Sequence, residues 1–274
     1  MYEKYLTLVD MKRFLFLLAV TAMCSSCAIL QNLDANYLAS GTAKALQAAS
    51  ITDQQVQAYM RQYTNQLDAA NRVSPTSSSY SKRLARLTRN FTDVDGLPLN
   101  FKVYETTSVN AFACADGSVR VFSGMMDLLD DDELLGVIGH EIGHVALKHS
   151  KKEVQSALLR SAAIDGLASA STTVATLSES QLGAIGEAAL SARYSKKQEN
   201  EADDYGYEFL KAHGKNPVAM IKSFQKMMAL QGKSQTQSTS GFSQMFSSHP
   251  DIATRISRLT QKAVADGYIQ VKQQ

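Results

Sequence analysis

The sequence DDDELLGVIGHEIGHVALKH, residues 130–149, decides how the rest of the chain is interpreted. Asp130 is followed three residues later by Glu133, which is typical of a capping box, and negative charge is favourable at a helix N-terminus. The residues that follow are mostly apolar, beginning with Val137 and Ile138 around the centre of the stretch. We therefore predict a buried helix that begins at the acidic run and continues to about the last residue quoted.

Residues four positions apart lie on the same face of a helix, so His140 and His144 can direct their imidazoles at one ion. Zinc accepts neutral imidazole nitrogen at about 2.0–2.1 Å in tetrahedral sites. Glu141 lies beside this pair and can reach a water at the metal without being a ligand, which is the arrangement of metalloproteases. The alternative, two satisfied core histidines beside a solvated glutamate, is costly on a buried helix. The pattern predicts one zinc ion per chain and Glu141 as general base.

A catalytic zinc site needs a third protein ligand and an open position. Residues 196–204, KKQENEADD, lie within residues 180–213, which we predict to form one long helix. Glu199 and Asp203 share a helix face, so Glu199 can bind the metal while Asp203 accepts a hydrogen bond from a ligand histidine and orients it. Glu201 points to roughly the opposite side of the helix. Geometry therefore favours Glu199 over Glu201 as the ligand, and we expect Glu201 to be solvated.

The remaining sequence predicts a mostly helical α+β fold with one small sheet. Strands are predicted at residues 99–104, 110–115 and 118–122, with a turn signal before the last, and their spacing favours an antiparallel sheet packed on the histidine-bearing helix. Further helices are predicted in residues 53–67, 81–91, 152–166, 217–230 and after Pro250. We expect a helical segment and tether at residues 27–75 and a catalytic domain at residues 76–270.

Residues 11–27, MKRFLFLLAVTAMCSSC, combine a short basic region with an apolar run too short to span a bilayer stably. Residues 1–26 are therefore predicted to be a signal peptide of the bacterial lipoprotein type, with Cys27 as the acylated first residue of the mature chain. Cys24 is a poorer candidate because bulky Met23 precedes it. A plain secretory signal, without lipid, is the alternative. Cys114 is then the one remaining cysteine and is expected to be a small packed residue.

Composition argues against a nucleic-acid partner. The chain has 274 residues, 20% of them charged, and a formal net charge of +2. It also has no long run of lysine and arginine, so no strong attraction to a polyanion is implied. Ordinary globular composition indicates one catalytic domain, with a tail.

The motif HEIGH, the later E-x-x-A-D segment and residues 247–251, SSHPD, together resemble the zinc metallopeptidase family of HtpX, BepA and the CAAX prenyl protease. The resemblance implies a gluzincin-type fold with Glu199 as the zinc ligand. It also implies that His249 lies at the site, where it occupies the metal's open position in a resting state or helps to bind the transition state, and that Arg255 matches a family arginine. From the residues alone, a histidine before proline is more often a surface or capping residue. His149 and His213 are expected to be helix-end residues, favourable to the helix dipole.

The resemblance and the order of elements predict that Asn110, Ala111, Phe112 and Ala113 form an edge strand that pairs with extended substrate. We expect a zinc endopeptidase, lipid-anchored at the periplasmic face of a bacterial outer membrane, that acts on unfolded, misfolded or misassembled envelope proteins. One alternative is a chaperone-like outer-membrane assembly lipoprotein with a quiescent, self-inhibited zinc site, which would bind assembly factors. Another is a secreted zinc protease without lipid.

Overall fold

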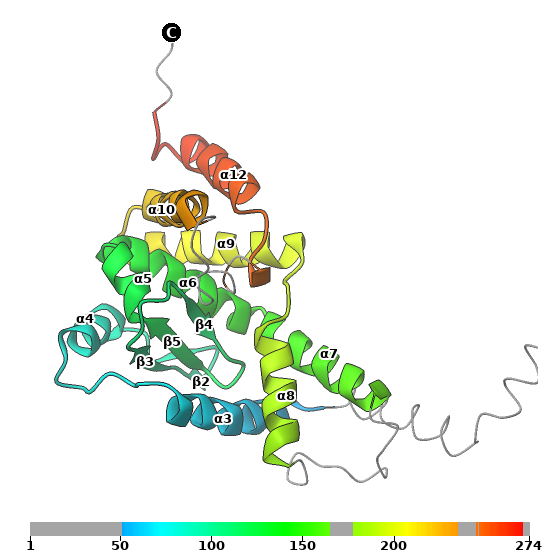
Figure 1. Ribbon diagram of the computed structural model, residues 1–274. Helices are drawn as coiled ribbons and strands as arrows, with labels where there is room; N and C mark the ends of the chain where they lie inside the picture. Colours follow the sequence, from blue (N-terminus) through cyan, green and yellow to red (C-terminus); the bar gives the residue numbers. More distant parts are fainter. Residues whose placement is uncertain (1–50, 165–177, 235–244, 246, 271–274) are drawn as a thin grey trace, which may run out of the picture.

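The computed structural model describes residues 51–164, 178–234, 245 and 247–270 (Figure 1). The predicted signal peptide and Cys27 lie outside these residues. The described helices are α3 (Asp53–Ala70), α4 (Ser79–Thr88), α5 (Ser123–Leu128), α6 (Asp131–Ala146), α7 (His149–Ile164), α8 (Glu179–Leu190), α9 (Lys196–Ala212), α10 (Val218–Ser234) and α12 (Ile252–Ala265). None of the helices in these ranges is both long enough and apolar enough to cross a membrane. The mostly helical α+β class predicted from the sequence is confirmed.

The main sheet has three strands, β3 (Asn100–Tyr104), β4 (Ala111–Ala113) and β5 (Ser118–Phe122), in the order β3-β5-β4. β4 pairs antiparallel with β5, but β3 pairs parallel with β5, so the predicted antiparallel sheet is wrong for this pair. A parallel pair needs a connection of about a dozen residues. Residues 105–117 supply that length, carry the chain through β4 and return it between the two outer strands. A separate hairpin is formed by β1 (Asp93–Val94) and β2 (Leu97–Pro98).

Helix α6 is the centre of the molecule and begins as predicted. Asp130 Oδ1 accepts from the backbone N–H of Glu133, and Glu133 Oε2 accepts from the backbone N–H of Asp130, both at 2.9 Å. In Figure 1, α6 lies between the sheet and the layer of α9, α10 and α12. All residues from Glu133 to Val145 are buried. The helix ends at Ala146, three residues before the predicted end, and Lys148 then adopts a left-handed conformation with φ of 58°.

Glycines allow α6 and α9 to approach closely. A Cβ added at Gly206 of α9 would lie 2.9 Å from the backbone nitrogen of His140, and one at Gly139 of α6 would lie 2.7 Å from Phe209 Cδ1. Such distances leave no room for a side chain, because interiors are close-packed. The small residues therefore set the separation at which side chains of α9 reach those of α6.

The predicted single helix over residues 180–213 is wrong, because the chain breaks into α8 and α9 at residues 191–195. Ser195 caps α9: its Oγ accepts from the Gln198 backbone N–H, and Gln198 Oε1 accepts from the Ser195 backbone N–H at 2.9 Å. Hydroxyl side chains favour this capping position over a helix interior. The break places Glu199 in the first turn of α9, where a negative charge is favourable.

Helix α3 packs against α8 and closes a second apolar cluster beside the sheet. Tyr59 donates its hydroxyl hydrogen to the Leu182 carbonyl at 2.7 Å. Asp68 of α3 pairs with Arg120 of β5, whose Nε lies 2.8 Å from Oδ1. These contacts join α3 to the rest of the fold, and the domain boundaries drawn from the sequence stay predictions.

Candidate metal centre

Four buried side chains bring ligand atoms to one point. His140 and His144 come from α6, Glu199 from α9, and His249 from the segment before α12, and one ligand atom of each lies within 4.8 Å of the others. His144 Nε2 lies 3.1 Å from His140 Nε2 and 3.5 Å from Glu199 Oε1. His249 Nδ1 lies 2.9 Å from Glu199 Oε1 and 3.3 Å from His140 Nε2.

These separations fit a metal ion. Bonds of about 2.0–2.2 Å in a tetrahedron place the ligand atoms roughly 3.3–3.6 Å apart. The separation of His249 Nδ1 from Glu199 Oε1 is 2.9 Å, and that of His140 Nε2 from Glu199 Oε2 is 3.7 Å. Two imidazole Nε2 atoms that face each other at 3.1 Å also need a cation or a proton between them. Nitrogen and carboxylate donors of this kind suit a divalent transition metal.

Asp203 and Arg255 lie behind His140. His140 Nδ1 lies 3.0 Å from Asp203 Oδ1, the contact that the spacing of Glu199 and Asp203 predicts. Arg255 reaches Asp203 through Nε and Nη2, and its Nη1 lies 2.5 Å from Glu199 Oε2. Burial favours the neutral acid, but Arg255 outweighs it and lowers the pKa of Asp203. Burial acts in the same way on Glu199, where His249, His144 and Arg255 hold the pKa well below its usual value.

His144 has partners that the sequence interpretation missed. His149 Nδ1 lies 3.1 Å from His144 Nδ1, and His149 Nε2 lies 3.1 Å from Glu201 Oε2. Tyr194 stacks on the His144 ring with centroids 3.8 Å apart. His149 is expected at the C-terminal end of the histidine-bearing helix, but this is wrong: it is the first residue of α7, 1% exposed and turned toward the site. The sharp turn at Lys148 brings it there, and nothing in the local spacing indicated that turn.

Glu141 is buried next to the cluster. Its Oε1 lies 3.7 Å from His249 Nε2, and among the described residues it has no hydrogen-bond partner. Burial raises the pKa of Glu141, although His249 and His140 oppose that shift. A cavity of about 10 Å³ beside it is lined by polar side chains, among them Glu141 and His249, and by apolar ones such as Phe224. About this volume is needed for one water molecule, so the carboxylate can take a proton from a water held there.

His249 is not a surface cap. It is 7% exposed, and its ring lies between Glu141 and Glu199. Burial lowers the pKa of His249, but the two carboxylates outweigh burial and raise it above its usual value. His249 therefore lies at the ligand cluster, as the family resemblance implies, and its role there stays a prediction.

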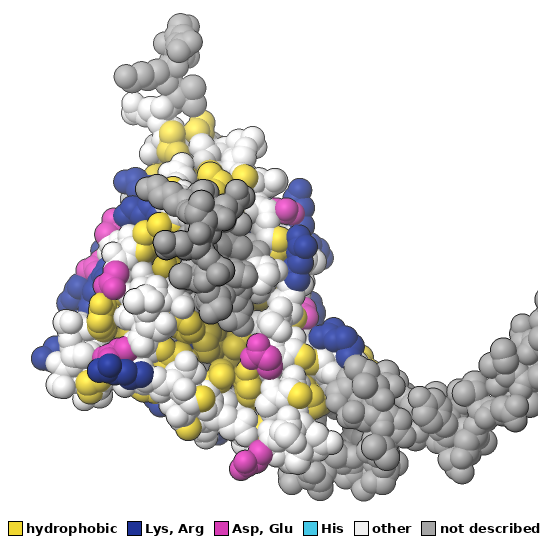
Figure 2. All heavy atoms as spheres, viewed as in Figure 1, with side chains coloured by type: hydrophobic (Ala, Val, Ile, Leu, Met, Phe, Trp, Pro, Cys, Tyr) yellow, Lys and Arg dark blue, Asp and Glu magenta, His cyan; other side chains and the backbone are white. Residues whose placement is uncertain are grey.

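The predicted substrate strand lies at an edge of the sheet. β4 is the outer strand beside β5 and packs on α6, which carries the cluster. Asn110 is buried, and its Oδ1 accepts from the Ala111 backbone N–H at 2.9 Å. Phe112 and Ala113 are also buried. Figure 2 shows hydrophobic side chains gathered on the viewed face over the region of β4 and β5. The position suits backbone pairing, and the role in substrate binding stays a prediction.

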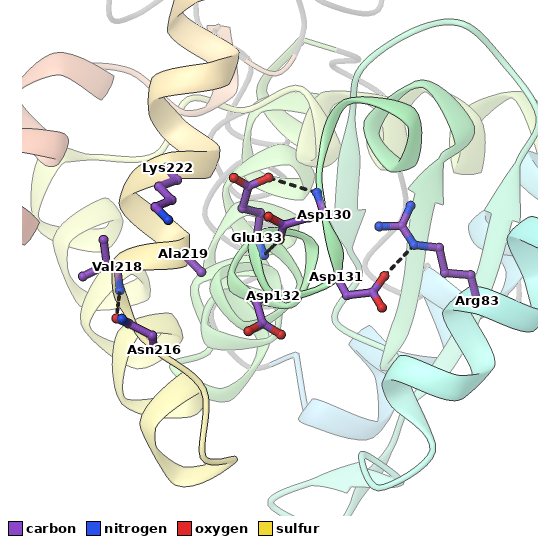
Figure 3. A pocket seen from close by; sticks show the side chains of 9 residues that line it. All are labelled: Arg83, Asp130, Asp131, Asp132, Glu133, Asn216, Val218, Ala219 and Lys222. Atoms are coloured by element: carbon purple, nitrogen blue, oxygen red, sulfur yellow. Dashed lines mark hydrogen bonds and ion pairs between the residues drawn. The ribbon is translucent and has the colours of Figure 1, made fainter. Parts of the chain in front are cut away.

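A larger pocket of about 480 Å³ lies at the opposite end of α6 (Figure 3). Its acidic side chains have partners among the described residues: Asp131 Oδ1 lies 2.7 Å from Arg83 Nε, and Glu133 Oε2 lies 2.6 Å from Lys226 Nζ. The pocket therefore has the features of a helix N-terminus and no cluster of metal ligands. Cys114, in the core beside the sheet, is buried as expected, and burial raises the pKa of its thiol to about 12.

Comparisons with known proteins agree with this geometry. The sequence model of peptidase family M48 matches residues 78–263, more than half of the chain. The chain is 40% identical over 257 residues to metalloprotease LoiP of Escherichia coli K12, covering 93% of this chain and 98% of that protein. It is 38% identical over 261 residues to metalloprotease YcaL of the same organism, covering 94% and 100%. A putative β-barrel assembly-enhancing protease of Vibrio cholerae is 30% identical over 187 residues, which are 62% of this chain and 36% of that protein.

Proposed function

Because the chain belongs to peptidase family M48, a family of metallopeptidases, we propose that it is a zinc-dependent endopeptidase with His140, His144 and Glu199 as the metal ligands. The observation that carries the proposal is the convergence of four buried ligand atoms within 4.8 Å. Two imidazoles and one carboxylate are a known ligand set of catalytic zinc, which leaves a fourth position for water or substrate. One zinc ion per chain follows from this set.

Glu141 is the general base in this proposal. A bound zinc ion would polarise the scissile carbonyl and make a water more acidic. Glu141 takes a proton from that water at Oε1 and passes it to the nitrogen of the leaving amine. Its burial and its raised pKa support this role, because a base works best when its pKa approaches the operating pH. The small cavity beside it is lined by both His140 and His249, so a water held there lies between the base and the ligand cluster.

His249 and Arg255 complete the proposed site. Arg255 pairs with Glu199 and Asp203 and so keeps a positive charge at the site. This charge stabilises the negative charge that develops on the substrate oxygen in the transition state. The nearness of His249 Nδ1 to Glu199 Oε1 supports a resting state in which His249 occupies the fourth position. Once displaced, its ring can donate a hydrogen bond to the oxyanion of the transition state.

We also propose that residues 110–113 bind extended substrate by adding a strand to the edge of the sheet. The substrates would be misfolded or misassembled proteins of a bacterial envelope, and Cys27 would anchor the mature chain by lipid at the periplasmic face of the outer membrane. Two observations support this setting: the lipoprotein-type sequence before Cys27, and a relative whose name links a protease to β-barrel assembly. Detergent partitioning of wild type against Cys27→Ser tests the anchor.

A second function is favoured by one observation, the closeness of His249 to the ligand cluster. A site blocked in this way suits a chaperone-like assembly protein whose zinc centre is quiescent. Casein cleavage separates the two functions. Activity in wild type, or only in His249→Ala, supports the endopeptidase, whereas no cleavage by either protein favours the scaffold.

The central experiment measures metal content and casein cleavage of the purified mature chain, with and without chelator. We expect one zinc per chain and chelator-sensitive cleavage. Glu141→Gln should keep the metal and lose cleavage by about 10²–10⁴-fold, the range for general acid–base catalysis. Glu199→Ala should lose both, whereas Glu208→Ala, an exposed carboxylate on the same helix, should lose neither. A metal-free sample under zinc-replete conditions, or normal cleavage by Glu141→Gln, would contradict the proposal.

A further inference from the structure

We infer that His149 and Glu201 are positioning residues that hold His144 in the tautomer needed to bind the metal. The inference rests on the proposed function of His144 as a ligand. It follows from the geometry of a hydrogen-bonded chain that runs from His144 through His149 to Glu201.

The two nitrogens of His144 face different surroundings. Nε2 points into the ligand cluster, 3.1 Å from His140 Nε2 and 3.5 Å from Glu199 Oε1. A nitrogen that binds metal carries no proton, so the single proton of the neutral imidazole has to be on Nδ1. His144 is fully buried, and an unpaired N–H at such a place is costly. The acceptor for this proton is His149 Nδ1 at 3.1 Å.

This contact sets the tautomer of His149 as well. Because its Nδ1 accepts, the proton of neutral His149 is on Nε2, which lies 3.1 Å from Glu201 Oε2. A carboxylate only accepts, so the direction of both hydrogen bonds is determined: His144 donates to His149, and His149 donates to Glu201. The side chain of Glu201 is 42% exposed, so its charge is stabilised by water while one oxygen reaches the buried ring.

The two histidine ligands are thus oriented by different means. His140 Nδ1 lies 3.0 Å from the carboxylate of Asp203 directly. His144 reaches the carboxylate of Glu201 only through an intervening imidazole. Partners of this kind fix the ring orientation and raise the basicity of the ligand, and their removal costs about 10–100-fold in metal affinity.

The backbone supports this arrangement. α6 ends at Ala146, and the left-handed Lys148, whose N–H donates to the Val145 carbonyl at 3.0 Å, turns the chain so that His149 lies against the last turn. The ring of Tyr194 stacks on one face of the His144 ring. The imidazole is held between an aromatic ring and a hydrogen-bond acceptor.

Zinc affinity of the mature chain, measured by competition with a chelator of known affinity, tests the inference. His149→Phe keeps a ring but removes the acceptor, and it should weaken zinc binding by about 10–100-fold. His149→Asn keeps an acceptor near the position of Nδ1 and a donor, so it should restore affinity to within a few fold of wild type. Glu201→Ala should weaken binding by a smaller factor. Glu208→Ala, on the same helix but outside the site, is the matched control and should bind as wild type does.

Thermal unfolding of each metal-free variant separates positioning from folding. Equal affinity of folded His149→Phe and wild type would overturn the inference, and so would equal losses in the Phe and Asn variants. If His149→Phe does not fold, the zinc affinity of Glu201→Ala tests the inference instead. Wild-type affinity in that variant would show that Glu201 does not position His149 and would overturn the inference. In zinc-loaded wild type, ¹⁵N correlation spectra should show the Nε2–H tautomer of His149, and the Nδ1–H tautomer would contradict it. Absence of zinc binding by wild type itself would instead refute the proposed function.

Discussion

Arg255 holds Asp203 in a two-bond ion pair, with Nε 2.9 Å from Oδ2 and Nη2 2.5 Å from Oδ1. Both residues are buried, and the same Oδ1 lies 3.0 Å from His140 Nδ1. One carboxylate of α9 therefore contacts both the arginine of α12 and a predicted ligand of α6. The orientation of His140 depends in this way on a helix more than a hundred residues later in the chain.

Removal of this arginine should be strongly destabilising. Arg255→Met removes the closest charge partner of the buried Asp203 carboxylate, and loss of such a partner costs about 3–5 kcal/mol. The control is Lys262→Met on the same helix, because Lys262 pairs with the exposed Glu208 at 3.1 Å and such a pair contributes about 0–1 kcal/mol. Urea unfolding of the metal-free proteins measures both. Similar decreases in the free energy of unfolding for the two variants would show that the buried pair contributes no more to stability than an exposed one.

The close contact of α6 and α9 should not tolerate a methyl group. Gly206→Ala places a Cβ 2.9 Å from the His140 backbone nitrogen, and overpacking of this kind costs about 1–3 kcal/mol. It should also lower zinc affinity, because α9 carries Glu199. Gly183→Ala in α8 is the control: its Cβ would meet nothing nearer than 3.8 Å, so the better helix former should stabilise by about 0.5–1 kcal/mol. Urea unfolding with zinc titration tests the pair, and equal effects would contradict the prediction.

Low pH should weaken the ion pair between Asp68 of α3 and Arg120 of the sheet. Burial opposes ionisation of Asp68, but hydrogen bonds from Arg120, Lys102 and Tyr104 lower its pKa from 3.8 to about 2. A depressed pKa stabilises the folded state above the unfolded value, and that stabilisation is lost as pH falls through the folded value. The unfolding free energy of metal-free wild type should therefore exceed that of Asp68→Asn by a constant amount above about pH 5. The gap should narrow below about pH 4, and a gap independent of pH down to about 2 would argue against this pairing.

Metal binding should stabilise the fold, because the ligands come from α6 and α9 and converge only in the folded chain. Free zinc at 100 times its dissociation constant should raise the free energy of unfolding by about 2.7 kcal/mol. Chelator should reverse this rise. Thermal unfolding across a zinc titration measures it, with Glu199→Ala as the comparison that should not respond. An equal response in that variant would place the stabilising ion elsewhere.

The elements that local pattern controls could be predicted from the sequence. Helix α6, its capping box at Asp130 and the shared face of His140 and His144 depend on residues within one or two turns of each other. The choice of Glu199 over Glu201 followed from helix geometry alone, and the structure brings Glu199 to the histidines. The resemblance to known metallopeptidases added His249 and Arg255, which spacing did not reach.

The break before α9 was missed although Ser195 and Gln198 have the spacing of a capping box, which is a local pattern. Other features depend on contacts that no local pattern encodes. The parallel pairing of β3 with β5 depends on how the chain between them is placed on α6. His149 has the sequence of a helix end, and only the turn at Lys148 places it against His144.

The sequence by itself determined which residues can bind a metal and which helix presents two of them, because side-chain chemistry and the helical repeat are local properties. Helix spacing also predicted Asp203 as the partner of a ligand histidine. Only the tertiary structure decided that this histidine is His140 and that His149 with Glu201 orients His144. The reason is physical. A buried polar group needs a hydrogen-bond partner within about 3 Å. Which residue supplies that partner depends on how the helices pack against one another, and spacing along the chain does not show it.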